Sequence, residues 1–116
     1  IFFFFINDLK KVNDNLGHVA GDQIIRQAAN VLRNNLRSND IVARLGGDEF
    51  VVLSVETNQD EAEILFKRLM AAFKEVQISI AIGFAIRHPS QGLVEAAAQA
   101  DQNMYIHKRQ MKMLSL

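Results

Sequence analysis

The sequence opens with six apolar residues, Ile1 to Ile6, of which four are phenylalanine. Aromatic and β-branched residues favour strands, and the run lacks the alternation of apolar and polar residues that marks a strand with one wet face. We therefore expect a strand that is covered on both faces and lies centrally in a sheet. Six residues are too few to cross a bilayer, and neither a basic segment nor a small-residue cleavage site indicates a signal peptide.

Helical periodicity appears in three later places. Apolar residues recur at steps of three and four over residues 24–36 and 62–73, which predicts two helices that pack one face onto the sheet. Asn58 stands three residues before Glu61, which is the spacing of a capping box at the start of the second helix. A third helix is expected over residues 93–109.

Two strand-like runs, residues 41–45 and 50–55, are joined through Gly46-Gly47. Because glycine reaches the positive φ values of a tight turn, these runs predict a β-hairpin. Alternation over residues 78–86 predicts one more strand. The polar, glycine-punctuated residues 7–22 predict a loop that contains a helical turn.

The expected elements run in the order strand, helix, hairpin, helix, strand, helix. Since a hairpin pairs its strands antiparallel, this order predicts an α/β sandwich of helices around a central, mainly antiparallel sheet. A chain of 116 residues has enough apolar sequence for one core only. We therefore expect a single domain over residues 1–116.

The charge balance and the lack of cysteine limit the classes of function that the chain can have. Basic and acidic residues number thirteen each, so the formal net charge is zero and no general attraction for nucleic acid or an acidic membrane follows. The absence of cysteine excludes disulfides and thiolate zinc sites and suits the cytoplasm, although a longer chain with a membrane tether stays open. Any metal must be bound by oxygen or histidine.

The segment Gly46-Gly47-Asp48-Glu49-Phe50 is the sharpest local signal for chemistry. Glycine lets a phosphate or a metal approach the backbone, and two adjacent carboxylates supply the hard oxygen ligands that suit Mg²⁺. The alternative is an ordinary hairpin with two solvated acids. The motif alone does not separate these interpretations.

Further motifs occur in order on both sides of this hairpin, at Lys10, Asn13, Asp22, Ala100-Asp101, Met104-Tyr105 and Lys108. Together they resemble the GGDEF family of diguanylate cyclases, and the resemblance covers nearly the whole chain. It implies a fold like that of nucleotide cyclases and polymerase palms. It also implies one GGDEF domain truncated at its N-terminal side, because the family's first helix would precede Ile1.

The resemblance assigns roles to individual residues. An amide and a carboxylate match the positions that hydrogen-bond guanine, and lysines match those that contact phosphate. Asp22 alone also suits a turn, and solvated surface lysines are common. The matched positions are Lys10, Asn13, Asp22, Gly46, Gly47, Lys108 and Lys112 for GTP, Asp48 and Glu49 for catalysis, and Asp48, Glu49 and the backbone of Ile6 for Mg²⁺.

The family's reaction joins two GTP molecules into cyclic di-GMP and releases pyrophosphate. Because one domain holds one GTP, the resemblance implies a symmetric homodimer for catalysis. It also implies sensory or effector domains in the same longer chain. GTP and cyclic di-GMP are therefore the expected ligands, and no nucleic acid is expected.

Phe5 is the largest departure from the family pattern. Alignment through Lys10 and Asn13 puts Phe5 where the first strand normally ends in an aspartate that binds magnesium, and a phenyl ring cannot ligate a hard cation. We therefore expect a weakened Mg²⁺ site and impaired catalysis. A second departure is Met111-Lys112-Met113 in place of Gly-Arg-Asn, which keeps a positive charge at Lys112 but loses the arginine fork.

A second binding site is expected at Arg37-Ser38-Asn39-Asp40, which resembles the family's inhibitory Arg-x-x-Asp motif, with Arg68 as a further contributor. The planar guanidinium grips phosphate and stacks on guanine. The alternative is a helix end followed by a capped turn. Three functions thus stay open: a weakened cyclase, a fully active cyclase, and a catalytically dead receptor for cyclic di-GMP.

Overall fold

The computed structural model describes residues 1–114, which form four strands and four helices. Short connections join successive elements. In chain order the elements are β1 (Phe2–Ile6), α1 (Leu9–Leu16), α2 (His18–Asn35), β2 (Ile41–Arg44), β3 (Glu49–Leu53), α3 (Gln59–Glu75), β4 (Ile80–Phe84) and α4 (Leu93–Leu114).

The four strands form one sheet in the order β2-β3-β1-β4, and every neighbouring pair is antiparallel. The prediction of a central first strand in an antiparallel sheet is therefore confirmed. In this register Phe4 lies between Phe50 and Ile82, whereas Phe5 lies between Glu49 and Ala81. The last residue pairs of β1 thus bring Phe5 next to the acidic hairpin.

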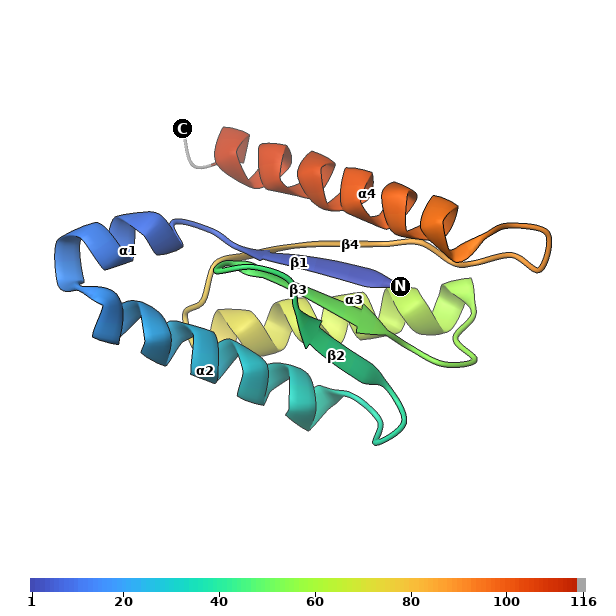
Figure 1. Cartoon of the computed structure of the whole chain (residues 1–116), viewed down its shortest axis with the longest axis horizontal. Helices are drawn as coiled ribbons and strands as arrows, with labels where there is room; N and C mark the ends of the chain where they lie inside the picture. Colours follow the sequence, from blue (N-terminus) through green and yellow to red (C-terminus); the bar gives the residue numbers. More distant parts are fainter. Residues whose placement is uncertain (115–116) are drawn as a thin grey trace.

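Helices cover both faces of the sheet: α2 and α3 pack on one face, and α4 packs on the other (Figure 1). Phe2, Phe4 and Ile6 point into the buried core shared with α2 and α3, and each fully buried aromatic ring contributes about 2 kcal/mol to folding. Phe3 and Phe5 alternate with them and are only partly buried. The α/β sandwich expected from the element order is confirmed.

The close approach of α4 to the sheet depends on Gly83 in β4. A Cβ atom at this position would collide with the backbone of α4 at Ala100, Asn103 and Met104. The absence of a side chain therefore lets the helix backbone lie directly on the strand. Within residues 1–114, no helix is both long and apolar enough to cross a membrane.

Residues 7–22 differ from the prediction of a loop with one helical turn. They form the eight-residue helix α1 and the start of α2, with only Gly17 between them at φ 88°. Leu9 anchors α1 by inserting into the core, although most of the helix is polar. A single apolar anchor is too weak a periodic signal to predict a helix.

The hairpin forms as predicted, but its turn does not use positive φ at Gly46 or Gly47. The connection between β2 and β3 has four residues and closes through a hydrogen bond from Leu45 N to Glu49 O (2.9 Å). A loop of this length needs no left-handed residue.

The remaining boundaries also shift. The last strand is shorter than predicted, at Ile80–Phe84, and the last helix extends to Leu114. The capping box is confirmed: the Asn58 side chain accepts a hydrogen bond from Glu61 N (2.8 Å), and the Glu61 carboxylate accepts one from Asn58 N (3.2 Å).

Candidate functional site

A cavity of about 600 Å³ lies where β1 ends, between the start of α1 and the end of α4. A hydrogen bond from Ile6 N to Asp48 O (2.8 Å) fixes the hairpin against this strand end. The fold thus gathers several predicted site residues around one hollow. The cavity is lined by Phe5, Ile6, Asn7, Asp8, Leu9, Lys10, Lys11, Asp48, Ser79, Lys108, Met111 and Lys112.

The two acids of the hairpin lie in a partly buried setting. Burial raises the pKa of Glu49, the negative charges of Asp101 and Asp48 raise it further, and Lys108 partly opposes them. Asp101 was not assigned a role from the sequence, although Ala100-Asp101 was part of the motif. The arrangement concentrates negative charge on the hairpin side of the strand end.

The Lys108 side chain contacts the Phe5 ring at this strand end. The Lys108 ammonium lies 3.6 Å from the centroid of the Phe5 ring and 5.8 Å from that of Tyr105. Such cation–π contacts are worth about 0.5–1 kcal/mol at exposed sites. A cation and an apolar ring therefore occupy the end of β1. Among residues 1–114, no three or more histidine, cysteine or acidic side chains group to hold a metal ion.

Asn7 anchors the opposite wall of the cavity. Its amide donates hydrogen bonds to Ser79 Oγ (3.0 Å) and to Met111 Sδ (3.6 Å), and its backbone N–H donates to Ser79 O (2.9 Å). These contacts join β1, the start of β4 and the end of α4. Sequence reasoning missed this residue; its polar type directly after an apolar strand was the available signal.

Asn13 and Asp22 do not line this cavity within the described residues. Asn13 belongs to α1 and Asp22 to α2, so the turn at Gly17 brings their helices together. The Asn13 amide packs against the backbone at Gly21, where any side chain would collide with it. The absence of a side chain at Gly21 therefore leaves room for the amide. The predicted contact of both residues with guanine stays a prediction.

Arg44 holds the turn of the hairpin. Its guanidinium donates from Nε to Gly46 O (2.9 Å) and from Nη2 to Gly47 O (3.1 Å). The space where side chains of Gly46 and Gly47 would stand is open. Both carbonyl groups are thereby satisfied while the outer side of the turn stays accessible. Sequence reasoning did not single out Arg44.

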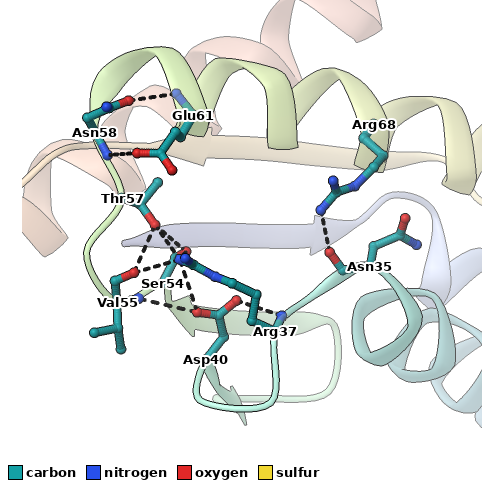
Figure 2. Close-up of polar contacts among 9 residues, drawn as sticks. All are labelled: Asn35, Arg37, Asp40, Ser54, Val55, Thr57, Asn58, Glu61 and Arg68. Atoms are coloured by element: carbon teal, nitrogen blue, oxygen red, sulfur yellow. Dashed lines mark hydrogen bonds and ion pairs between the residues drawn. The ribbon is translucent and has the colours of Figure 1, made fainter.

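Arg37, Asp40 and Arg68 line a second cavity of about 270 Å³. Figure 2 shows these residues with their polar contacts. Arg37 Nη2 donates to Val55 O (2.6 Å), Thr57 Oγ1 (2.9 Å) and Ser54 Oγ (3.3 Å). The fold thus brings the three predicted residues together, and Arg37 already has several partners in its own chain.

The side chains of Asp40 and Arg68 also form hydrogen bonds within the chain. The Asp40 side chain is 2% exposed, and its carboxylate accepts hydrogen bonds from the backbone N–H groups of Arg37 (2.9 Å) and Val55 (3.2 Å). Arg68 donates to Asn35 O (2.6 Å) at the end of α2 (Figure 2). Asp40 therefore caps the turn that follows α2, as predicted by the alternative interpretation of a helix end followed by a capped turn.

His107 has a structural role. Its Nδ1 accepts a hydrogen bond from Ile82 N (2.9 Å), and burial lowers the pKa of the ring. The neutral ring therefore satisfies a backbone group on the free edge of β4. None of the three histidines was predicted to bind metal.

Comparison with known proteins supports the same family at the levels of sequence and structure. The chain is 36% identical to the signaling protein YkoW of Bacillus subtilis over 97% of its length, and 36% identical to the diguanylate cyclase DgcP of Pseudomonas aeruginosa over 90%. It spans only 15% and 17% of these two relatives.

Solved structures give the fold. The GGDEF domain of YfiN from Pseudomonas aeruginosa superposes with a TM-score of 0.86 at 35% identity, covering 94% of this chain and 74% of that one. The GGDEF domain of DgcB from Caulobacter crescentus, solved in complex with cyclic di-GMP, gives 0.79 at 28% identity, covering 93% and 70%. The predicted cyclase-type fold is confirmed.

The family model described as "Diguanylate cyclase, GGDEF domain" matches residues 1–114. This match includes β1, the acidic hairpin and α4, the elements that surround the first cavity. The chain therefore belongs to the GGDEF family of diguanylate cyclases.

Proposed function

We propose that this chain is a GGDEF domain that binds GTP and cyclic di-GMP and whose diguanylate cyclase activity is impaired by Phe5. The reaction of the family converts two GTP molecules into cyclic di-GMP and pyrophosphate. The observation that carries the proposal is the contact between Phe5 and the Lys108 ammonium, beside Asp48, at the end of β1.

The residues at this strand end do not fit the family's magnesium cluster. Asp48 and Glu49 provide two carboxylates, and the Ile6 backbone offers at most a neutral oxygen. Phe5 lies opposite Glu49, at the position where the resemblance calls for a third acid. Loss of a partner in the shell around a metal commonly costs about 10- to 100-fold in affinity or activity, so loss of a direct ligand costs at least that much.

Guanine recognition does not depend on Phe5. Asn13 and Asp22 belong to α1 and α2 and do not line the cavity at the end of β1, and Gly21 leaves room for the Asn13 amide. We therefore infer that GTP binding survives better than turnover, with Lys10, Lys108 and Lys112 contacting phosphate.

A fully active cyclase is the second candidate, and the hairpin favours it. Arg44 holds the Gly46-Gly47 turn, and the Ile6–Asp48 hydrogen bond holds it against β1. A signature turn positioned in this way is compatible with catalysis if another oxygen, such as that of Asp8, replaces the missing ligand.

A catalytically dead cyclic di-GMP receptor is the third candidate. The cavity lined by Arg37, Asp40 and Arg68 favours it, because two arginines, whose guanidinium groups suit phosphate, line one hollow. A regulatory domain of this kind would pass its signal to sensory or effector domains of a longer cytoplasmic chain. Turnover, by contrast, requires two copies of the domain to face one another as a homodimer.

Incubation of the purified protein with GTP and magnesium, followed by chromatographic separation of nucleotides, distinguishes these candidates. The proposal predicts GTP binding by calorimetry together with slow formation of cyclic di-GMP. Rapid formation supports the active cyclase. Binding of cyclic di-GMP without any turnover supports the receptor, and binding of neither nucleotide contradicts all three.

A further inference from the structure

We propose that the cavity at the end of β1 binds the polyphosphate of GTP without a divalent cation, with Lys108 taking the place of the metal. This inference rests on the proposed nucleotide binding and specifies its form: the ligand is the free nucleotide, and the magnesium complex is not required.

The charge of the cavity is the first support. Four lysines and two aspartates line it, so the lining side chains are positive on balance without any bound cation, and Glu49 opposes part of this charge from the hairpin side. A third carboxylate at position 5 would cancel one of these charges and face the phosphates directly. Phe5 removes that repulsion. The charged lining residues are Lys10, Lys11, Lys108, Lys112, Asp8 and Asp48.

The availability of the lysines is the second support. Within residues 1–114, Lys10, Lys11 and Lys108 make no hydrogen bond or salt bridge. The Lys108 ammonium lies over the Phe5 ring, and a ring face leaves the N–H donors of an ammonium group largely unused. A carboxylate at position 5 would instead bind this ammonium as a salt bridge. Phe5 therefore keeps Lys108 oriented toward the cavity and ready to donate to phosphate.

The charge of the ligand completes the argument. Mg²⁺ removes two negative charges from a nucleoside triphosphate when it binds. Because the attraction to a positive cavity scales with the ligand's charge, the free nucleotide is attracted more strongly than its magnesium complex. Because the site lacks the ligands for the metal, no metal–protein contacts offset this weaker attraction to the magnesium complex. The cavity thus favours the uncomplexed polyphosphate.

Calorimetric titration of GTP into the protein, once with excess EDTA and once with excess MgCl₂, tests the proposal. We expect an affinity in EDTA at least equal to that in magnesium. Inorganic tripolyphosphate, titrated in EDTA, is expected to bind as well, because the lysines recognise phosphate and not the base. Binding of GTP only with magnesium overturns the proposal and leaves nucleotide binding intact. Binding in neither buffer overturns both.

Two variants sharpen the test. Lys108→Met is expected to weaken GTP binding in EDTA by about tenfold, because a charge-assisted hydrogen bond is lost. Lys67→Met, on the exposed side of α3, is the matched control and is expected to bind like the original protein. Phe5→Asp is expected to make binding depend on magnesium. If that variant does not fold, an unchanged affinity of Lys108→Met in EDTA still overturns the proposal.

Discussion

The two cavities differ in how their charged groups are satisfied. At the end of β1, Lys108 rests on an aromatic ring, and Lys10 and Lys11 have no polar partner within residues 1–114. At the other cavity, Arg37 and Asp40 are bound by the loop between β3 and α3 (Figure 2). The lysine side chains of the first region therefore contribute little to stability and can bind a ligand. The second supports the fold, and any ligand there must compete with existing contacts.

Removal of Asp40 should give the largest effect on stability. Its buried carboxylate accepts two backbone hydrogen bonds, so we expect Asp40→Ala to cost about 2 kcal/mol in the free energy of unfolding. Urea denaturation measures this. Ser38→Ala, in the same loop, is the control. Lys11→Ala, at the first cavity, should change stability by less than about 0.5 kcal/mol. Equal losses for Asp40→Ala and Lys11→Ala would remove the contrast between the two regions.

Arg37→Ala should weaken cyclic di-GMP binding by about tenfold, since a guanidinium contact to phosphate is lost. It also removes three hydrogen bonds to residues 54–57, so the folded state must be verified by circular dichroism. Arg26→Ala, an exposed arginine on α2, is the matched control. Calorimetry that finds the same affinity for Arg37→Ala and the original protein excludes this cavity as the binding site.

Gly21→Ala should separate nucleotide binding from stability. The added methyl group would displace the Asn13 amide, although alanine favours a helix by about 1 kcal/mol over glycine. We expect a melting temperature near that of the original protein but GTP binding weakened by about threefold or more, as for one lost hydrogen bond. Gly92→Ala, where a side chain meets open space, is the control. Unchanged GTP affinity in Gly21→Ala would show that Asn13 does not recognise guanine.

The smallest expected effect concerns pH. Burial lowers the pKa of His107 below its usual value of 6.5, so the unfolded chain binds more protons than the folded one just below this pH. This histidine therefore costs stability as the pH falls through about 6.5. His107→Gln keeps an acceptor for Ile82 N but does not titrate. On acidification, the melting temperature of His107→Gln should fall less than that of the original protein. An identical fall in melting temperature for the two proteins contradicts this role.

The sequence predicted the sheet and the helices of the core because their apolar residues repeat with the right period. Phe2, Phe4 and Ile6 are buried, as the apolar run required, and the Asn58–Glu61 capping box needs only local spacing. Helix α1 was missed because one buried residue, Leu9, gives no period.

The candidate sites could be predicted only in part. The motif residues Asp48, Lys10 and Lys108 surround one cavity, as expected from the resemblance. The contacts of Arg44 with the turn and of Asn7 with Ser79 and Met111 could not be predicted, because they depend on strand register and on the approach of α4. The hydrogen bonds of Arg37 to the loop between β3 and α3 could not be predicted from the sequence either.

The most direct test of the account compares cyclic di-GMP synthesis by the original protein and by Phe5→Asp, with GTP and magnesium. The new carboxylate would lie next to Lys108 and opposite Glu49, on the partly buried face of β1, so the strand should tolerate it. We expect synthesis to rise by at least about tenfold, whereas Phe5→Leu stays slow. If the original protein already works as fast as Phe5→Asp, with both folded, then Phe5 is not the defect and the chain is a fully active cyclase.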